Sequence, residues 1–526
     1  MITKIKSNRR FKLKGYLKLK NEGKIFELRK ISQLLGDVDF KISNLGYNYD
    51  RGLSAKQFLL NFISGKRLNE EIIYSIGSKK KINFFPIPVE YQKVLEDNNI
   101  RISKTSCSLS FSVLVFLFWA YGVLYFFKTI FGAIWGKKNL SRKKYIYFDR
   151  INRNNLPSPY SDGQSYDVIT WFINYFQIND MDIVFPVKNY KSNKYIGNNL
   201  FFKAEPFALD IRKSNFFKIL FQSLRIIFSS LISFRWSNWI LLSEDLKANF
   251  YNLSGNEKKN LTKYLVPNSI TFFRPIWTYY AEKNGTKVIS YFYSISEVYT
   301  LKKNNFKHYD HLRFMNWPII YVWDKFQKIK ISNLILSKSK LQIVGSIPFS
   351  TTDTDLLKTK KPILAIFDID PIIQSIYFGI STLIDLDANN PKIHIKFIND
   401  IIDTFSDKYN IVIKPKRGAN NYYCPIYKDF LKELNKQKNI SIVSHLISAH
   451  RIISKSNLIV SFPFTSASII AKNLNIPTFY YDSTGEINKK DKASHGILLL
   501  NTKSELLNWK NSDLLKLEKH NAHGNE

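Results

Sequence analysis

One stretch of this chain is as apolar as the interior of a lipid bilayer. From Thr105 to Phe127 no side chain is charged, and most are Leu, Val, Phe, Tyr or Trp. A helix that crosses the hydrocarbon core of a membrane needs about 20 predominantly apolar residues, and this stretch supplies them. The sequence therefore predicts a hydrophobic membrane segment over residues 105–136. A helix buried in the core of a soluble domain is the alternative interpretation.

Basic residues lie on both sides of this segment. Two precede it, Arg101 and Lys104, and a larger group follows it: Lys128, Lys137, Lys138, Arg142, Lys143 and Lys144. Lys and Arg mark the cytoplasmic side of a membrane, so a single crossing would leave one basic flank on the wrong side. The heavier downstream flank favours a crossing that keeps residues 128–526 in the cytoplasm. A helix that dips into the membrane and returns satisfies both flanks, so both arrangements stay open.

A second stretch, residues 216–242, combines a narrow polar stripe with a broad apolar body. The polar side chains recur at helical spacing: Lys218, Gln222, Arg225 and Ser229. Almost all the others are Phe, Leu or Ile, and two tryptophans lie near the end of the stretch. A basic stripe on an apolar helix is typical of a helix that lies in a membrane interface. A core helix with one exposed edge is the alternative.

The chain is strongly basic. It has 78 Lys and Arg against 42 Asp and Glu, a formal net charge of +36, and an excess of this size requires an anionic partner. Residues 1–30 are rich in Lys and Arg without an apolar core after them, so we expect no signal peptide. Residues 1–104 are expected to form a basic N-terminal region of unknown role, within which residues 1–30 are expected to be either a solvated arm or a contact with lipid headgroups.

Membrane lipid is favoured over nucleic acid as the anionic partner. The sequence has no zinc-finger spacing, no basic region followed by heptads and no aromatic pair of RNA-binding strands, so we expect no nucleic-acid partner. Its two cysteines, Cys107 and Cys424, are too few for a disulfide framework and have no metal-binding spacing.

From about Lys143 onward, short apolar strands alternate with helical stretches. The first series has strands at 144–148, 182–185, 269–273 and 287–292. After a break around 325–345, a second series follows, at 341–345, 362–367, 410–414, 440–444, 457–461 and 478–481. This alternation predicts an α/β chain with two parallel-sheet domains in tandem, over residues 143–325 and 340–510. Ligands of such sheets bind at the carboxyl ends of the strands.

Three strand ends of the second domain carry polar or charged side chains. Asp368 and Asp370 follow the strand at 362–367, and a basic group closes and follows the strand at 410–414: Lys414, Lys416 and Arg417. Full positive charges at this edge suit a phosphate. A solvated basic surface is the alternative.

The third strand end runs directly into a helix. After the strand at 457–461 come Phe462, Pro463, Phe464, Thr465 and Ser466, with Ser466 as the expected N-cap and Thr465 as a second hydroxyl beside it. A helix N-terminus with free N–H groups and two hydroxyls is suited to an anion. Together with the basic group, this loop predicts a cradle for a nucleotide phosphate, whereas simple helix capping is the alternative.

The segment Ser461-Phe-Pro-Phe-Thr-Ser466 resembles the bacterial surface-polysaccharide biosynthesis proteins named for their PFTS motif. The agreement extends to four further segments and covers roughly residues 270–485: Ile289–Ser294, Val344–Phe349, Phe367–Pro371 and Ile413–Arg417. The resemblance implies a glycosyltransferase-like enzyme of the GT-B architecture, with two Rossmann-like domains, acting in capsule or O-antigen assembly. It also implies a nucleotide-sugar donor, with no further cofactor, and a lipid-linked glycan acceptor at the cytoplasmic face of the bacterial inner membrane.

One departure from related enzymes concerns the nucleotide. Many GT-B enzymes carry a Glu-Ala pair and then Gly-x-Pro after this loop, and their Glu binds the ribose; here Ile470-Ala471 and Asn475-Ile476-Pro477 stand in those places. No ribose-binding carboxylate therefore comes from this helix. Hydroxyl-rich loops at this point are similar to those of CMP-sialic acid, Kdo and CDP-glycerol transferases, which suggests a CMP- or CDP-linked donor.

Inverting transfer by such an enzyme needs a general base facing the donor from the first domain. Asp149, after the first strand, is the first candidate, and Glu297 is the second; an ordinary surface carboxylate is the alternative for each. Asp368 and Asp370 are expected to orient sugar hydroxyls. The leaving group would be stabilised by the helix start at Ser466 and by the basic group, without an obligatory metal.

Metal-dependent transferases hold a divalent ion with an Asp-x-Asp pair. This chain has several such pairs, at 37–39, 180–182, 353–355, 368–370 and 385–387, so none is singled out and we assign no metal.

Two other functions stay open. A polyol-phosphate transferase using CDP-glycerol or a relative would have the same scaffold, although Lys-Pro-Lys at 414–416 stands where such an enzyme would have His-Pro. A non-catalytic component of polysaccharide assembly would also keep the fold.

Overall fold

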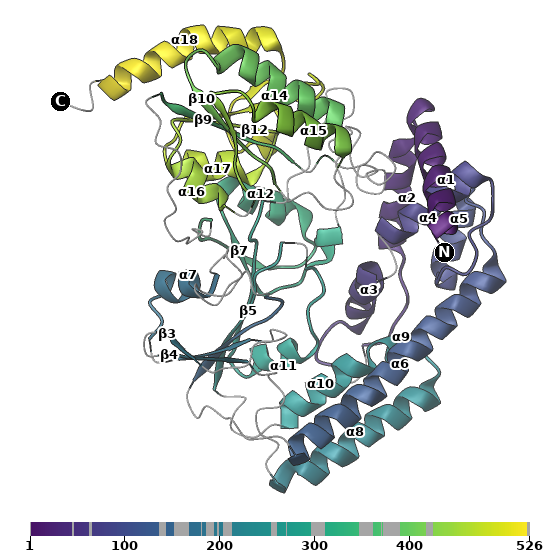
Figure 1. Ribbon diagram of the computed structural model, residues 1–526. Helices are drawn as coiled ribbons and strands as arrows, with labels where there is room; N and C mark the ends of the chain where they lie inside the picture. The colour runs from purple at the N-terminus through teal and green to yellow at the C-terminus, as the bar shows by residue number, and fades with distance from the viewer. Residues whose placement is uncertain are drawn as a thin grey trace.

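The computed structural model has two α/β domains, a helical unit at the N-terminus and a pair of long apolar helices along one side (Figure 1). It describes residues 2–44, 47–62, 66–135, 144–151, 168–179, 181–185, 194–196, 199–203, 213–253, 260–269, 271–295, 311–346, 361–369, 371, 390–416, 424–445 and 447–522.

The N-terminal region is a folded helical unit, so the expectation of a solvated basic arm is wrong. Its helices are α1 (Ile2–Asn21), α2 (Ile25–Asp37), α3 (Arg51–Phe62), α4 (Lys66–Ser78) and α5 (Val89–Asp97). Tyr16, Leu28 and Ile72 belong to its own buried core. Helices α1 and α4 cross so closely that a Cβ atom at Gly15 would lie 2.0 Å from the carbonyl oxygen of Ile73. The many lysines of α1 obscured this core in the sequence, although Tyr16 and Leu19 between them are buried.

Helix α3 fastens this unit to the first α/β domain. The Arg51 side chain is buried and forms an ion pair of 2.8 Å with Asp245 on α10 (Leu242–Leu253). Its guanidinium also donates to the side-chain oxygen of Asn238 at 2.9 Å. A buried charge is stable only when it is paired and hydrogen-bonded, so this contact fixes α3 against α10.

The first domain contains an 8-stranded sheet in the order β3-β4-β2-β1-β5-β6-β7-β8. Every pair is parallel except β3 with β4. The strands are β1 (Tyr145–Phe148), β2 (Asp182–Phe185), β3 (Lys194–Ile196), β4 (Asn199–Lys203), β5 (Leu261–Val266), β6 (Lys287–Tyr291), β7 (Ile319–Val322) and β8 (Lys340–Ile343). Its helices include α7 (Val168–Tyr175), α11 (Trp277–Lys283) and α12 (Lys325–Leu334).

Two expectations about this sheet are wrong. The strand expected at 269–273 does not form; β5, at Leu261–Val266, occupies the place beside β1 instead. The apolar run at 271–273 is buried outside the sheet, where the carbonyl oxygen of Thr271 accepts a hydrogen bond from the Trp317 indole at 3.1 Å. The strand expected to open the second domain is β8, which pairs with β7 and closes the first sheet.

The second domain contains a 6-stranded parallel sheet in the order β11-β10-β9-β12-β13-β14. Its strands are β9 (Ile363–Phe367), β10 (Asn410–Lys414), β11 (Ile440–Ile442), β12 (Leu458–Ser461), β13 (Thr478–Tyr481) and β14 (Leu499–Leu500). The helices are α14 (Pro391–Phe405), α15 (Pro425–Leu434), α16 (Ala449–Ser454), α17 (Ser466–Asn473) and α18 (Lys503–Ala522). Numbered from its first strand, the order is that of a Rossmann sheet, whose strand order reverses between β9 and β12. The two parallel sheets confirm the α/β fold class.

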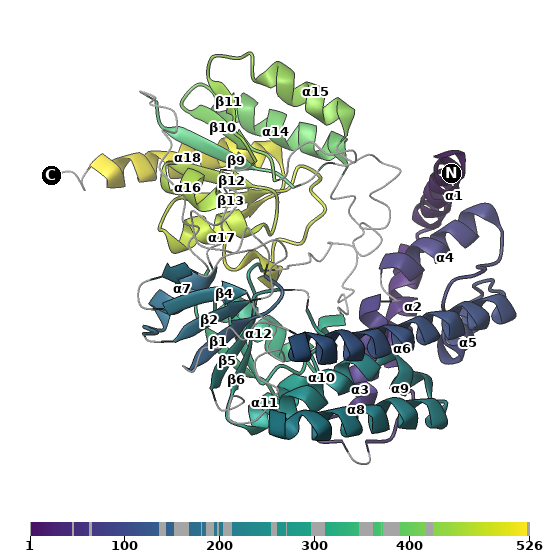
Figure 2. The same cartoon turned by 60° about the horizontal axis from the view of Figure 1, so that its bottom comes forward.

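Two long apolar helices, α6 (Lys104–Trp135) and α8 (Lys213–Ser233), lie side by side on the outside of the first domain (Figures 1 and 2). The single helix expected over 216–242 ends at Ser233. Phe234 has a φ of 46°, which breaks the helix before α9 (Trp236–Ile240). A left-handed residue cannot continue a right-handed helix, so the chain turns there into α9 and then α10.

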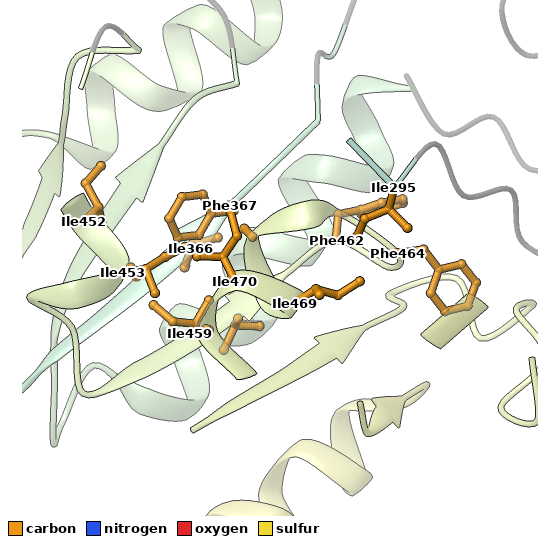
Figure 3. Packing of buried hydrophobic residues seen from close by; sticks show 14 of the residues in the cluster. Ile295, Ile366, Phe367, Ile452, Ile453, Ile459, Phe462, Phe464, Ile469 and Ile470 are labelled. Atoms are coloured by element: carbon orange, nitrogen blue, oxygen red, sulfur yellow. The ribbon is translucent and has the colours of Figure 1, made fainter. Parts of the chain in front are cut away.

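The two α/β domains share buried contacts. Ile295 of the first domain belongs to the same buried cluster as Phe462 and Phe464 of the second (Figure 3). The Nδ1 atom of His495 lies 2.6 Å from an Asp324 carboxylate oxygen at the start of α12. Burial would raise the pKa of Asp324, but the hydrogen bonds from His495 and from the first turn of α12 outweigh it, so the pKa lies below its ordinary value.

Candidate functional site

The reversal of strand order in the second sheet brings two of the predicted loops together. Strands β9 and β12 pair in parallel, with Ser461 opposite Phe367. The backbone N–H of Phe462 donates to the carbonyl oxygen of Phe367 at 3.1 Å, so the PFTS loop begins where β9 ends. In open α/β sheets this point is where ligands bind. The structure therefore places Asp368 and the PFTS loop at the position that topology favours for a ligand.

The two phenylalanines of the motif anchor the loop. Phe462 and Phe464 are buried, and the Phe464 ring packs edge-on against Tyr480 with ring centres 5.5 Å apart. Phe464 has a φ of 60°, a conformation that is strained for a bulky residue and that persists where packing holds it. The hydroxyl of Tyr480 donates to the carbonyl oxygen of Thr465 at 3.3 Å. Phe464 therefore fixes the loop's path through its ring, which lies in the core.

Helix α17 begins at this loop with an uncapped first turn. Its N-cap is Thr465, one residue before the expected Ser466, and the Thr465 side chain makes no capping hydrogen bond. The Oγ1 atom of Thr465 is buried and has no hydrogen-bond partner among the residues that the structure describes. The first N–H groups of a helix have no partner within the helix, so this turn can bind an anion. Ser466 is half-buried at the same turn.

Below this turn, Ser461 and Ser468 join the strand to the helix. Their Oγ atoms lie 2.5 Å apart, and both side chains are fully buried. The Ser468 hydroxyl is thus used within the protein. The half-buried Ser466 hydroxyl and the first-turn N–H groups are left for a ligand, and the buried Thr465 hydroxyl lies beside them.

The basic residues at the end of β10 divide into a buried and an exposed cation. Lys414 is 7% exposed, and its ammonium donates to the carbonyl oxygens of Pro415 and His445, each at 3.3 Å. Lys416 is exposed. Since β10 pairs directly with β9, both lie at the same edge of the sheet as the PFTS loop. Arg417 and Asp370 lie outside the described residues.

Asp368 binds the Lys416 loop through its buried carboxylate. Its carboxylate accepts a hydrogen bond from the backbone N–H of Lys416 at 2.9 Å and another from the Tyr427 hydroxyl at 2.5 Å. Asp368 is 4% exposed and Tyr427 is fully buried. Because the Asp368 carboxylate is almost fully buried and binds the Lys416 loop, the geometry favours a role in holding this loop over the expected role in orienting sugar hydroxyls.

Two residues of this site were missed in the sequence. Tyr427 on α15 binds Asp368, and His394 on α14 is fully buried, with its ring centre 4.8 Å from that of Phe462. Both lie on helices, far in sequence from the loops they support. No spacing in the sequence marks such long-range partners.

The first sheet has its own reversal of strand order, between β1 and β5, and Asp149 lies there. It follows β1 directly and is half-buried. One carboxylate oxygen accepts from the Tyr264 hydroxyl on β5 at 2.5 Å, and the other accepts from the backbone N–H of Arg150 at 2.7 Å. Arg150 has a φ of 53°, so this loop, like the PFTS loop, holds a large side chain in the left-handed region.

Tyr264 remains a hydrogen-bond donor to Asp149 at any physiological pH. Burial, followed by the adjacent Asp149 carboxylate, raises the pKa of its hydroxyl well above the ordinary value. The second candidate base, Glu297, lies outside the described residues. Within the ranges that the structure describes, no group of three or more His, Cys, Asp or Glu side chains is arranged to hold a metal ion.

Several solved structures are similar to this chain at low identity. The wall teichoic acid polymerase TagF, in a variant soaked with CDPG, is 11% identical, with 77% of this chain and 92% of that chain covered and a TM-score of 0.36. A glycosyltransferase from Rickettsia africae is 10% identical, with 65% and 80% covered and a TM-score of 0.33. TarM of S. aureus, in complex with fondaparinux, alpha-GlcNAc-glycerol and UDP, is 12% identical, with 52% and 53% covered and a TM-score of 0.31. No curated protein matches the chain.

A family model gives the more specific match. The model of the polysaccharide biosynthesis PFTS motif proteins matches residues 221–510, which include strands β5 to β8 of the first sheet and all of the second sheet. Since this match spans more than half of the 526 residues, the chain belongs to the polysaccharide biosynthesis PFTS motif family.

Proposed function

We propose that this chain is a glycosyltransferase that moves a sugar from a nucleotide-activated donor to a lipid-linked surface polysaccharide. The observation that carries the proposal is the anion site at the reversal of the second sheet. There, the uncapped first turn of α17, the Thr465 hydroxyl, for which the described residues provide no hydrogen-bond partner, and the exposed Lys416 lie at one edge of one sheet. Membership of a polysaccharide biosynthesis family supports a sugar as the transferred group.

The site would act on the leaving group. As the bond between sugar and phosphate breaks, negative charge develops on the departing phosphate oxygens. First-turn N–H groups and hydroxyls, already in place, stabilise this charge without reorganisation, and Lys416 adds a full positive charge. Arg417 is proposed as a second cation. In this mechanism the protein groups carry the charge that a metal ion carries in other transferases.

Asp149 is the proposed general base, and the transfer would invert the anomeric centre. Its two carboxylate oxygens each accept one hydrogen bond, which leaves further lone pairs for the acceptor hydroxyl. The hydrogen bonds from Tyr264 and Arg150 hold the carboxylate in one orientation. A general base needs a fixed orientation so that its oxygen lies within hydrogen-bond distance of the proton that it removes. Glu297 is the second candidate for this role.

The acceptor is proposed to be a capsule or O-antigen intermediate on a membrane lipid, at the cytoplasmic face of the bacterial inner membrane. A cytidine-linked donor, CMP- or CDP-bound, is the proposed nucleotide, because the hydroxyl-rich loop before α17 is similar to those of CMP-sialic acid, Kdo and CDP-glycerol transferases, and α17 has no carboxylate where many GT-B enzymes bind the ribose. Ile470 and Ala471 occupy that part of the helix, and both are buried.

Thermal unfolding of the purified full chain with CMP-, CDP-, UDP- and GDP-sugars and with CDP-glycerol tests the proposal. A ligand at 100 times its Kd adds about 2.7 kcal/mol to the stability of the folded state. We expect stabilisation by one nucleotide sugar, and its loss in Ser466→Ala and Lys416→Ala. Lys432→Ala, which removes an exposed cation on α15, is the matched control and should keep it.

The outcomes separate three functions. Stabilisation by CDP-glycerol alone would favour a polyol-phosphate transferase. No stabilisation by any donor would contradict the enzyme proposal and favour a non-catalytic assembly component. Stabilisation that survives both site variants would contradict the placement of the phosphate.

A further inference from the structure

Helices α6 and α8 present one broad apolar surface to the outside. We call this surface the α6–α8 face; its most exposed side chains include Leu117, Leu124 and Phe131 on α6 and Phe221, Phe228 and Ile232 on α8. Their exposed fractions run from 48% for Phe131 to 78% for Ile232. Both helices are long and apolar enough to cross a membrane, and in each only 22% of the most apolar stretch is buried. An apolar surface of this extent marks a site of interaction.

The opposite side of α6 is attached to the protein along its whole length. Cys107 belongs to the core of the N-terminal unit, and Phe111, Val115, Tyr125 and Ile130 are buried in the core of the first domain. Together with the half-buried Phe118 and the buried Gly122, these positions recur every three to five residues, so they form one stripe on the helix. A helix fixed at both ends and in the middle is not free to leave the protein and cross a bilayer by itself.

The contact between α6 and α10 is close. A Cβ atom added at Gly122 would lie 2.8 Å from Cγ of Leu242, so only glycine permits this approach. The two long helices are also tied to each other: the Trp119 indole on α6 donates to the Ser230 hydroxyl on α8 at 3.0 Å. Two turns earlier on the same face of α8, the Ser223 hydroxyl accepts a hydrogen bond from the Asn249 amide on α10 at 2.9 Å. The α6–α8 face is therefore a single rigid surface backed by α10.

Charges behind the face would oppose a crossing. Lys247 on α10 forms an ion pair of 2.7 Å with Glu244, and its ammonium lies 5.4 Å from the centre of the Tyr125 ring on α6. Opposite charge next to a buried ammonium raises its pKa against the effect of burial, so the pKa of Lys247 lies above its ordinary value and the charge persists. If α6 spanned the membrane, these charges would lie at hydrocarbon depth, at a cost of several kcal/mol.

Basic side chains beside the face indicate what covers it. Lys218 and Arg225 on α8 are exposed, and each lies close along the helix to an exposed phenylalanine, Phe217 or Phe228. Lys128 on α6 and Arg235 after α8 are exposed as well. Apolar side chains next to basic ones match a bilayer whose hydrocarbon lies just below anionic headgroups. An apolar protein partner would not account for these cations.

We propose that the α6–α8 face inserts into one leaflet of an anionic membrane without crossing it. The helices lie in the plane of the interface, with α10 and the first domain above them. Both flanks of the apolar segment, at Lys104 and Lys128, then lie on the same side of the membrane. This arrangement accounts for basic residues on both flanks, which a single crossing does not.

This anchoring does not rest on the proposed transfer reaction, because it needs no nucleotide donor. A lipid-linked acceptor would, however, be brought to the protein by the same membrane. Failure of vesicle binding would therefore leave the donor-binding result untouched, and failure of donor binding would leave the anchor untouched.

Flotation of the purified full chain with phosphatidylcholine vesicles containing phosphatidylglycerol tests whether an anionic membrane covers the α6–α8 face. We expect binding that falls at least tenfold in Phe221→Ser/Phe228→Ser and in Leu117→Ser/Leu124→Ser. The matched control is Leu336→Ser/Ile426→Ser, two equally exposed apolar residues outside the face, which should bind like the parent. Equal loss in the control, or no vesicle binding by the parent, would overturn the proposal. So would a dimer that the face variants convert to a monomer.

Labelling from one side tests the geometry. Lys104→Cys and Lys128→Cys are each placed in the chain, whose own Cys107 and Cys424 are buried, and the protein is bound to preformed sealed vesicles. We expect a membrane-impermeant maleimide to label both positions before detergent is added. Protection of one position until detergent opens the vesicles would mean that α6 crosses, and would overturn the proposal.

Discussion

Each sheet of this molecule has an aspartate directly after its first strand, at the point where its strand order reverses. Asp149 follows β1 and Asp368 follows β9, and each accepts a hydrogen bond of 2.5 Å from a tyrosine hydroxyl. The sequence predicts Asp149 as a general base and Asp368 as a residue that orients sugar hydroxyls, and both roles need a carboxylate that a substrate can reach. The two aspartates differ in burial and in their hydrogen-bond partners, so we expect them to have different roles.

The Asp368 side chain is buried inside the second domain. It is 4% exposed, its tyrosine comes from a helix, and its second oxygen holds the backbone N–H of Lys416. Asp149 is half-buried, its tyrosine comes from the neighbouring strand, and its second oxygen accepts a hydrogen bond from the N–H of the next residue. A carboxylate tied to a distant loop fixes that loop, whereas one tied to its own strand end can still meet a substrate. This difference supports the proposal that Asp149 is the reactive carboxylate and that Asp368 has a structural role.

The largest expected effect is on turnover in Asp149→Asn. Loss of a general base lowers the rate of the chemical step by about 10²–10⁴-fold. Asn keeps the size of the side chain and an acceptor for Tyr264, so the affinity for the nucleotide donor should not change. Donor binding and single-turnover transfer, measured on the same preparation, check this. Normal turnover would remove Asp149 as the base and direct attention to Glu297.

A smaller effect is expected in Asp368→Asn, and in a different quantity. The charged acceptor for the Lys416 N–H and the Tyr427 hydroxyl is lost in a buried site, which lowers the free energy of unfolding by about 1–3 kcal/mol. Since Lys416 is then less well held, the donor Kd should rise while turnover at saturating donor stays close to normal. Turnover that collapses with an unchanged donor Kd would reverse the roles given to the two aspartates.

The sequence predicts the second sheet better than the first. Each of the strands β9 to β13 is a short apolar run that ends in polar residues. The sequence pattern therefore predicts where these strands lie and that they pair in parallel. It also predicts that the Lys416 loop and the PFTS loop lie at the same edge of the sheet. In the first sheet, β5 carries Thr262 and Lys263 within the strand, which hides its apolar character, and the more apolar run at 271–273 is buried without joining the sheet. Which of these two segments joins the sheet depends on how the whole chain packs, and the local sequence does not show this.

The candidate site, too, could be predicted from the sequence only in part. The residue at each strand end was predictable, because parallel strands bring their carboxyl ends to one edge. The partners were not: Tyr427 lies 59 residues from Asp368, and Tyr264 lies 115 residues from Asp149. The N-cap moved from Ser466 to Thr465 because the loop turns at Phe464, whose left-handed backbone depends on packing against Tyr480.

The smallest effects are expected when the two tyrosines lose their hydroxyls, and here the comparison is sharpest because the substitutions are alike. Tyr264→Phe and Tyr427→Phe each remove one hydrogen bond to an aspartate, worth about 1 kcal/mol, or roughly fivefold in an equilibrium or a rate. If Asp149 reacts, Tyr264→Phe lowers turnover at saturating donor and leaves the donor Kd unchanged. If Asp368 positions Lys416, Tyr427→Phe raises the donor Kd and leaves that turnover unchanged. Each variant serves as the control for the other, since both delete a buried hydroxyl. The same pattern in both would mean that the two aspartates do not differ in role, and that their unequal exposure has no functional meaning.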